Sequence, residues 1–463
     1  MHLTCLEGTM KLMSLFDGSG GFPLAASLCG IDPVYASEVE PYPIAVTKSH
    51  FPNMKHLGDV GMINGADIEP VDIITFGSPC QDMSVAGKRA GLKHTAVGDD
   101  ETTRSGLFLE TIRIIKEMRL ATNGIYPRFA VWENVPGAFS SNRGEDFRLV
   151  LEEFIKISEP NAVMPAVPQA GWAYADCING DGWSVAYRTF DAQYWGVPQR
   201  RRRIYLVADF RGGRAGEILF KREGLRGHTA QSGTQREEIA RDIGNGTKAD
   251  DRAVGVALEK IILDDQGGQQ INVRSDGKSS TLRAEAHGNV HCVIDLKPLV
   301  YDTRGNGDGE TVPTITGDHN NRVTDYTALC CEAVPYLLKI RSGCEGGGKG
   351  PLVQTDKAVR VNYIVRRLTP TECARLQGFP DKWGHPDKKE DFTEEEYKFW
   401  LEVRNTYAKI NGKSEKEYTK AQMLTWYSKL HTDSAEYKMW GNGIALPNAL
   451  YVMQGIVTEV DNR

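Results

Sequence analysis

Apolar residues in the first 210 positions form short runs rich in β-branched side chains, and these alternate with longer amphipathic stretches. Five runs predict strands: "KLMSLF" (11–16), "PVYASE" (33–38), "VDIITF" (71–76), "RFAVWEN" (128–134) and "RRIYLVA" (202–208). Four stretches predict helices, at residues 21–30, 42–51, 105–120 and 145–157. Alternation of this kind is typical of the α/β class and predicts a doubly wound parallel sheet.

The pattern changes after residue 210. Residues 211–360 are rich in Gly, Asp, Asn and Thr, with short strand-like runs, and predict a smaller, mostly β or irregular domain inserted into the first. Two segments in it, "SSTLRAEAHGN" and "TVPTITGDHNN", are weakly alike, and a true repeat or chance similarity both remain open. Residues 361–463 are expected to complete the domain begun by residues 11–210. They contain a charged stretch near 385–436 that predicts solvated helices.

Composition limits the choice of function. The 463 residues carry a formal net charge of -6 with a pI of about 6.0, which is not the global signature of a nucleic-acid-binding protein. Locally, residues 188–241 hold twelve Lys and Arg against six Asp and Glu. This basic stretch, which includes Arg222 and Arg226, predicts contact with phosphates.

Nine cysteines without a CxxC pair argue against a zinc ribbon and against a disulfide framework. They favour a reducing compartment. No apolar run reaches the roughly 18 residues of a membrane span, and the N-terminus lacks the profile of a signal peptide. We therefore expect a cytoplasmic protein without a membrane partner, and the sequence motifs predict no metal site.

The segment "FGSPCQDMS" (76–84) places a cysteine at the end of a predicted buried strand. Gly77, Ser78 and Pro79 break the strand, so Cys80 lies where ligands bind in open α/β sheets. A half-buried structural cysteine is the alternative.

Glycines follow the first predicted strand in "SLFDGSGGFPLA" (14–25). Gly18, Gly20 and Gly21 would let the backbone approach a ligand at a helix N-terminus. The spacing is not the dinucleotide fingerprint GxGxxG, and a plain turn is the competing interpretation.

Carboxylates follow the next two strand ends. Glu38, with Glu40 as second choice, could accept hydrogen bonds from ribose hydroxyls, or it could be an ordinary surface carboxylate. Asp59 in "GDV" holds the following strand-end position and could contact an adenine amino group.

A glutamate and four arginines occur near two later strands. Glu133 in "VWENVPG" enters from an apolar run, so desolvation should raise its pKa, as suits a proton donor. The alternative is a surface capping residue. In "PQRRRRIYLV", strand alternation predicts Arg201 and Arg203 on one face and Arg200 and Arg202 on the other, although a charge run is usually solvated.

The order of these motifs is more specific than any one of them. FxGxGG, PCQ, ENV, QxRxR, "RRLTPTECARLQGFP" and "GNG" follow one another, with the long insert after the fourth. In this order the sequence resembles the C5 cytosine-specific DNA methyltransferases over residues 11–210 and 360–460. The resemblance implies a Rossmann-like methyltransferase sheet, with the insert as target-recognition domain.

The resemblance also implies the chemistry. Family members methylate carbon 5 of cytosine with S-adenosylmethionine, and a thiolate must first add at carbon 6 because carbon 5 is otherwise a poor nucleophile. Cys80 matches the nucleophile, and Glu133 matches the residue that protonates ring nitrogen 3. Arg201 matches the arginine that holds the cytosine carbonyl, and Arg203 the arginine that supports the site.

Eight positions match the family's cofactor site: Phe16, Gly18, Gly20, Gly21, Glu38, Asp59, Pro79 and Asn442. Two departures accompany them. Val39 stands where many relatives have a large aromatic residue, and Gly443 stands where a small side chain usually follows Asn442.

Double-stranded DNA is the implied partner, bound by a monomer, and the target cytosine must be flipped out of the stack to reach Cys80. The long loop after Cys80 resembles the family's mobile loop. Expected DNA contacts are Ser84, Lys88, Arg89, Gln199, Thr281, Leu282 and Arg283, with Arg283, Asn320 and Arg322 as candidate base readers.

Three other functions remain open. A tRNA-cytosine methyltransferase shares these motifs, but the insert of 150 residues fits duplex DNA better. A DNA-binding regulator that has lost catalysis is disfavoured by the intact Cys80, Glu133, Arg201 and Arg203. A generic α/β nucleotide-binding protein leaves the cysteine and arginine motifs unexplained.

Overall fold

The computed structural model describes residues 9–78, 105–164, 166–197, 199–220 and 369–461, and the backbone of six short strands between residues 261 and 367. These residues form two compact units. The first unit contains a large sheet and the described helices, and the second contains the six short strands.

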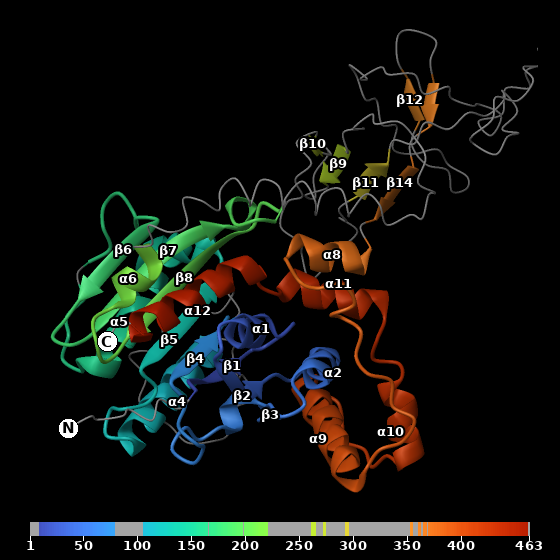
Figure 1. The fold of residues 1–463 in the computed structure, drawn as a ribbon, viewed down its shortest axis with the longest axis horizontal. Coiled ribbons are helices and arrows are strands. Elements are labelled where there is room, and N and C mark those ends of the chain that lie inside the picture. The colour runs from blue at the N-terminus through green and yellow to red at the C-terminus, as the bar shows by residue number, and fades with distance from the viewer. Residues whose placement is uncertain are drawn as a thin grey trace, which may run out of the picture. The chain divides into compact units, whose positions relative to one another are not determined.

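An eight-stranded sheet, with strand order β3-β2-β1-β4-β5-β8-β7-β6, is the centre of the first unit (Figure 1). Its strands are β1 Lys11–Leu15, β2 Asp32–Ser37, β3 Lys55–His56, β4 Ile73–Phe76, β5 Phe129–Asn134, β6 Ala175–Asn179, β7 Ser184–Asp191 and β8 Arg202–Asp209. All five predicted strands are confirmed, and so is the α/β class.

Strands β1 to β5 run parallel, as predicted. The last predicted strand, β8, instead runs antiparallel to both β5 and β7. A connection of only ten residues separates β7 from β8. So short a connection permits an antiparallel return but not the crossover that a parallel pair requires. The sheet is therefore mixed rather than wholly parallel.

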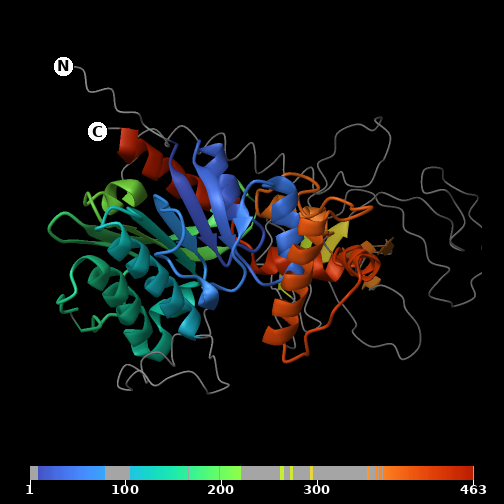
Figure 2. The ribbon, with the colours of Figure 1, turned by 90° about the horizontal axis from the view of Figure 1, so that it is seen from below.

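Helices cover both faces of this sheet. Helices α1 Gly21–Leu28, α6 Ala215–Phe220 and α12 Leu446–Asp461 lie on one face, and α4 Ser105–Ala121 and α5 Glu145–Ser158 on the other (Figure 2). Helix α2 Pro41–His50 connects β2 to β3, and 3-10 turns occur at Val60–Met62, Pro136–Phe139, Ser141–Gly144 and Ala192–Tyr194. The four predicted helices are α1, α2, α4 and α5. Among the described helices, none is long and apolar enough to cross a membrane.

Helix α5 illustrates how sequence pattern becomes packing. Gly144, with φ of 90°, precedes the helix. Two acidic residues occupy the first turn, where their negative charges interact favourably with the positive end of the helix dipole. Its apolar residues recur every three or four positions and are buried: Phe147, Val150, Leu151, Phe154 and Ile155. Ring stacking against Trp132 of β5 and Phe76 of β4 continues the core across the sheet, with centroids 6.2 and 6.0 Å apart.

Residues beyond the insert complete the first unit, through α8 Pro370–Leu376, α11 Asp433–Asn442 and α12. The unit limits differ from the expected domain limits by one element at each end. Helix α6 was expected in the insert, yet its Leu219 carbonyl accepts hydrogen bonds from Arg188 (3.0 Å) and Tyr451 (3.2 Å) of the first unit. Strand β14 Ile364–Arg367 was expected in the closing segment and instead pairs with β11 Cys292–Asp295 in the second unit.

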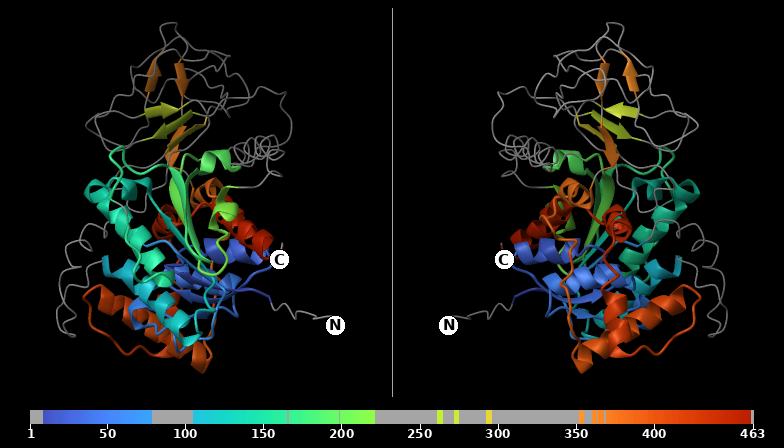
Figure 3. Two further views of the ribbon diagram at one scale, coloured as in Figure 1. Left: turned by 90° about the vertical axis from the view of Figure 1, so that its left-hand side faces the viewer. Right: turned by 90° about the vertical axis from the view of Figure 1, so that its right-hand side faces the viewer.

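The charged stretch forms two helices, α9 Glu394–Ile410 and α10 Lys420–Tyr427 (Figures 1 and 3). Each begins with a capping box, Thr393 with Glu396 and Thr419 with Gln422. One face of the pair is apolar and packs on α2, in a cluster made of Ile44, Ala45, Phe392, Trp400, Val403, Met423 and Tyr427. Helices are confirmed here, but the expectation that they are solvated is wrong for this face.

The second unit is described by its strands alone. Strands β9 Ile261–Asp264, β10 Asn272–Arg274, β11 and β14 form an antiparallel sheet in the order β10-β9-β11-β14. Strands β12 Leu352–Gln354 and β13 Arg360–Asn362 form an antiparallel pair. Its role in recognition stays a prediction.

Trp400 tests whether the α9–α10 pair is part of the core. Its side chain is 2% exposed, so Trp400→Ala should lower the free energy of unfolding by about 3–5 kcal/mol, through lost contacts and a cavity. Urea unfolding followed by circular dichroism measures this. Glu402→Ala, on the exposed side of α9, is the matched control and should stay within about 0.5 kcal/mol of wild type. A Trp400→Ala change as small as the control would contradict the packing.

Candidate active site

The carboxyl ends of β1 and β4 lie side by side at the centre of the sheet. Leu15 pairs with Phe76 in parallel register, and the chain leaves β1 toward β2 but leaves β4 toward β5. A crevice at such a switch point is where open α/β sheets bind ligands. The glycine-rich loop follows β1, and the segment that leads to Cys80, described as far as Ser78, follows β4. The fold therefore brings these two motifs to one place.

The glycine-rich loop has a backbone that few side chains would permit. Phe16, Gly18 and Gly20 have φ of 54°, 54° and 75°, in the left-handed region that is rare for a residue such as phenylalanine. A Cβ on Gly20 would lie 2.9 Å from Thr47, and one on Gly21 would lie 2.5 Å from Ile444. Conformation therefore favours glycine at positions 18 and 20, and packing requires it at positions 20 and 21.

Asp17 is buried inside this loop. Its Oδ1 accepts a hydrogen bond from Ser14 at 2.7 Å, whereas its buried Oδ2 has no hydrogen-bond partner in the described part of the chain. Burial raises the pKa of Asp17 to about 8. The loop thus contains a carboxyl group that folding favours in its neutral form.

Glu38, the predicted ribose acceptor, is tied to the same loop. Its carboxylate accepts hydrogen bonds from the backbone N–H groups of Gly18 (2.9 Å), Val39 (2.7 Å) and Glu40 (2.9 Å). Burial raises the pKa of Glu38, while these three donors act in the opposite direction. Glu40, the second choice, forms an ion pair with Lys438 at 2.7 Å instead.

Asp59 lies at the next strand end. Its Oδ1 accepts a hydrogen bond from the N–H of Gly61 at 2.9 Å and so caps a short 3-10 turn. The preceding Gly58 carbonyl accepts a hydrogen bond from Ser37, the last residue of β2, at 2.6 Å. The loops after β1, β2 and β3 are therefore joined by hydrogen bonds, with Gly18, Glu38 and Asp59 on successive loops.

Glu133 ends β5 and is 8% exposed. Its Oε1 lies 3.0 Å from Nε of Arg203. Burial raises the pKa of Glu133, as the sequence predicted, although Arg203 and Arg201 oppose the rise. A Cβ on Gly77 would lie 3.3 Å from Oε2, so the carboxylate lies against the backbone that leads to Cys80.

The four arginines alternate as predicted. Arg201 is 1% exposed and Arg203 is partly buried, whereas Arg200 and Arg202 are exposed. Nη2 of Arg201 donates to the carbonyls of Gly441 and Gly443. Its Nε and Nη1 are buried without a hydrogen-bond partner among the described residues, and burial lowers its pKa. This guanidinium therefore retains two buried donors for a further acceptor.

Two residues that the sequence did not single out hold the start of the Cys80 segment. Nε1 of Trp132 donates to the Ser78 hydroxyl, and Nδ2 of Asn134 donates to the Ser78 carbonyl, both at 3.1 Å. The Asn134 side chain also accepts from the N–H of Val135 at 2.8 Å. A signal was present, because Asn134 directly follows Glu133 in the ENV motif, yet its partner could not be inferred from spacing.

Asn442 lies at the end of α11 and is exposed. The next residue, Gly443, has no room for a side chain, because a Cβ there would lie 2.9 Å from Oγ of Ser19 and 3.0 Å from Gln377. The glycine at this position is thus a packing requirement. Its contact with Ser19 places Asn442 next to the glycine-rich loop.

The remaining predicted residues divide into two groups. Gln199 is described and buried. Those outside the described residues are Pro79, Cys80, Ser84, Lys88, Arg89, Arg222, Arg226, Thr281, Leu282, Arg283, Asn320 and Arg322.

The described arrangement offers two chemical functions at one edge of the sheet. Around β1 to β3, backbone N–H groups and the carboxylates of Glu38 and Asp59 could bind a polar nucleoside. Around β5 and β8, Glu133 is a carboxyl group whose pKa is raised by burial, and Arg201 can donate to a carbonyl oxygen. Such a pair suits a planar ring in which a carbonyl lies next to a basic nitrogen.

Comparisons with known proteins show the family of the chain. A sequence model described as C-5 cytosine-specific DNA methylase matches residues 10–158 and 175–399. The DNA N-6-adenine-methyltransferase of Escherichia phage P1 is 27% identical over 484 residues, covering 96% of this chain and 61% of that protein. The type II methyltransferase M.HhaI of Haemophilus parahaemolyticus is 28% identical over 390 residues, covering 83% and 88%. The chain thus spans less than two thirds of the phage P1 relative.

Similar solved structures include the Dnmt2 methyltransferase of S. pombe, with a TM-score of 0.43 and 14% identity over 98% of this chain and 99% of that one. Another is a putative DNA modification methyltransferase encoded within an E. coli prophage, with a TM-score of 0.39 and 16% identity over 98% and 100%. The family to which the chain belongs is therefore inferred from the match to the sequence model and not from these structures.

Asp17 gives a prediction for stability against pH. Because its folded pKa of about 8 exceeds the unfolded value of about 3.9, the folded state binds the proton more tightly between these pH values. Wild-type stability should fall as pH rises through this window, by up to about 1.4 kcal/mol per pH unit from this group. Asp17→Asn stays neutral, so its stability relative to wild type should rise from pH 4 to 8 in denaturant titrations.

The exposed Asp67→Asn is the matched control for Asp17→Asn and should follow the wild-type profile. Parallel pH profiles for wild type and Asp17→Asn would show that Asp17 is ionised in the folded protein throughout this range.

Proposed function

The chain belongs to the C-5 cytosine-specific DNA methylase family, and we propose that it transfers a methyl group from S-adenosylmethionine to carbon 5 of cytosine in duplex DNA. The cytosine is flipped into the site and reacts through a covalent adduct with Cys80. The observation that carries this proposal is the position of Glu133. It is buried beside Arg203, and its carboxylate lies against the Gly77 backbone that leads to Cys80.

Each proposed role has a physical basis in the described residues. Glu133 has a raised pKa, so it can hold a proton for cytosine nitrogen 3, and the buried donors of Arg201 suit the adjacent carbonyl at carbon 2. Arg203 keeps the carboxylate in place by its ion pair. Trp132 and Asn134 position Ser78, two residues before Cys80, and so restrict where the thiol can begin its approach.

The reaction balances as follows. The Cys80 thiolate forms a bond to carbon 6 while Glu133 gives its proton to nitrogen 3, and carbon 5 becomes an enamine carbon. Carbon 5 forms a bond to the methyl carbon, the bond from that carbon to the sulfonium sulfur breaks, and its electron pair stays on the sulfur, so that the cofactor would leave as the thioether S-adenosylhomocysteine. A base, for which water is our candidate, then removes the proton at carbon 5, the bond from sulfur to carbon 6 breaks, and nitrogen 3 returns its proton to Glu133.

The described residues fit S-adenosylmethionine, which would supply an electrophilic methyl group on a sulfonium. Glu38 would accept the ribose hydroxyls, and its orientation is set by three backbone donors. Asp59 would accept the adenine amino group from the next loop. The glycine-rich loop allows a close approach of backbone to the methionine part, since Gly20 and Gly21 leave no room for side chains.

Product analysis tests the proposal directly. Purified protein and isotope-labelled S-adenosylmethionine should convert duplex DNA to a product that yields labelled 5-methylcytosine on nucleoside digestion. Cys80→Ser should abolish this transfer and retain cofactor binding, because a hydroxyl is a far weaker nucleophile at neutral pH. Either of two results would contradict the proposal: labelled N6-methyladenine, the product that the name of the phage P1 relative implies, or label in tRNA with none in DNA.

The substitution Glu133→Gln tests whether the side chain acts as a proton donor or only fills its position. The amide keeps the size of the side chain but cannot deliver a proton, so methyl transfer should slow by at least about a hundredfold. Single-turnover rates on duplex DNA measure this. Glu40→Gln is the matched control, since Glu40 pairs with Lys438 outside the proposed proton path, and it should stay near wild type. A loss below threefold for Glu133→Gln would make the carboxylate structural.

The insert is proposed to choose the DNA site, with Arg283, Asn320 and Arg322 as candidate readers and Thr281 and Leu282 beside the flipped base. Replacing residues 221–369 by the equivalent segment of a relative with another specificity should move methylation to that relative's site, as bisulfite sequencing would show. These junctions keep α6 on the first unit and β14 in the second. Junctions at 211 and 360 divide both units and should give little folded protein. An active chimera that keeps the original site would contradict the assignment.

A further inference from the structure

We propose that His385, His431 and Glu436 form a binding site for a divalent transition metal ion, with zinc as the preferred ion. Their ligand atoms all lie within 4.8 Å of one another. His385 follows α8, His431 lies between α10 and α11, and Glu436 belongs to the first turns of α11. The sequence motifs predict no metal site, and these two histidines are separated along the chain by α9 and α10.

The distances suit a small ion after a modest movement. Nε2 of His431 lies 3.0 Å from Oε2 of Glu436, and the His385 and His431 ring centroids are 4.7 Å apart. Ligands about 2.0–2.2 Å from a tetrahedral zinc lie roughly 3.5 Å from each other. His385 is exposed, so its ring can rotate to close the remaining gap without disturbing the core.

The ligand set selects the class of ion. Two imidazoles and one carboxylate are ligands typical of zinc, whereas calcium and magnesium prefer oxygen ligands alone. Since both histidines are exposed, water can complete the fourth position. The site therefore takes a transition metal with nitrogen affinity.

Neighbouring groups hold the ligands in place. The Glu436 side chain is 3% exposed, and its Oε1 accepts a hydrogen bond from Nε1 of Trp440 at 3.2 Å. The Tyr42 ring stacks on His431, and the Tyr42 hydroxyl donates to the carbonyl of Gly384, next to His385, at 2.5 Å. Partners of this kind fix ligand orientation and strengthen metal binding.

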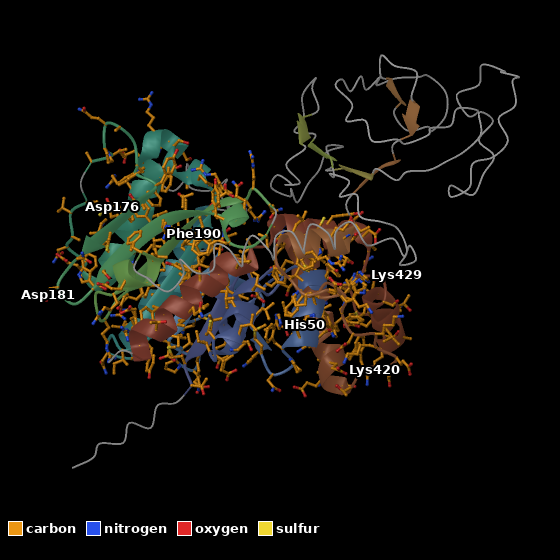
Figure 4. All side chains as sticks on the ribbon, turned by 45° about the horizontal axis from the view of Figure 1, so that its top comes forward. His50, Asp176, Asp181, Phe190, Lys420 and Lys429 are labelled. Atoms are coloured by element: carbon orange, nitrogen blue, oxygen red, sulfur yellow. The ribbon has the colours of Figure 1, made fainter. Side chains whose placement is uncertain are left out.

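A metal ion at this site would link the end of the α9–α10 pair to the rest of the first unit. Figure 4 labels Lys420 at the start of α10 and Lys429 just past its end, on the connection that continues to His431. A metal ion would join this connection to α11 and to the segment after α8. The same α11 ends at Gly441 and Asn442, and the Gly441 carbonyl accepts from Arg201. Bound metal thus stabilises the segment that supports the catalytic arginine.

Zinc binding to the full-length protein tests the site without any activity measurement. Chelator-stripped wild type is titrated with zinc against a chromophoric competitor and should bind one ion that His385→Ala loses or weakens at least about tenfold. His385 is exposed, so this variant should fold, and its metal-free melting temperature checks that it does. His431→Ala should behave alike. Cys177→Ala, at a partly exposed thiol elsewhere in the unit, is the matched control and should bind like wild type.

The absorption spectrum of bound cobalt distinguishes metal binding at this site from metal binding to cysteine thiolates. Cobalt-loaded wild type should show visible absorption bands without sulfur-to-metal charge transfer, and His385→Ala should lose them. Zinc should also raise the melting temperature of wild type and not that of His385→Ala. Equal zinc affinity in wild type and both histidine variants, or a thiolate spectrum that they leave unchanged, overturns the proposal. Neither result bears on methyl transfer, which is measured separately.

Discussion

The hydrogen bonds of a buried guanidinium, which join two distant parts of the chain, are the interaction on which the first unit depends. Arg201 directly precedes β8, and its hydrogen-bond acceptors, the Gly441 and Gly443 carbonyls, lie 240 and 242 positions further along the chain. Burying a cation costs several kcal/mol unless other groups compensate it. The turn between α11 and α12 therefore has to lie against β8. Since Gly443 also packs on Ser19, the same turn lies against the glycine-rich loop. One turn therefore contacts both Arg201 and the glycine-rich loop.

Features that depend on neighbouring residues could be predicted from the sequence. Strand periodicity predicted that Arg201 and Arg202 would lie on opposite faces, because successive side chains of a strand alternate. The structure adds that the face of Arg201 is the buried one. The apolar run before Glu133 predicted that its carboxyl would be desolvated. The carboxylates after β2 and β3 were found from their position at strand ends, where parallel strands place polar groups together. Each of these inferences used fewer than ten consecutive residues.

Features made by contacts between distant segments could not be predicted in this way. The hydrogen bonds from Trp132 and Asn134 to Ser78 join two strands whose spacing along the chain carries no periodic signal. The buried face of α9 and α10 was missed because charged residues dominate that stretch, and only the apolar surface of α2 shows what Trp400 packs against. Strand β8 was assigned correctly, but its direction depends on β7, which the pattern did not reveal. Gly443 was interpreted as a departure from the family, whereas the Ser19 contact makes it necessary.

The position of α12 has a consequence for how the protein is made. Helix α12 packs on α1 and α6 and covers one face of a sheet whose last strand, β8, ends at Asp209. At about 5–20 residues per second, a ribosome needs roughly 10–50 s to proceed from β8 to α12. During that time the sheet is present without the helix that covers it, while the second unit is being synthesised. The apolar sheet face that α12 covers in the finished protein is therefore exposed until α12 has been synthesised. During this interval, chaperones that bind nascent apolar segments can bind it.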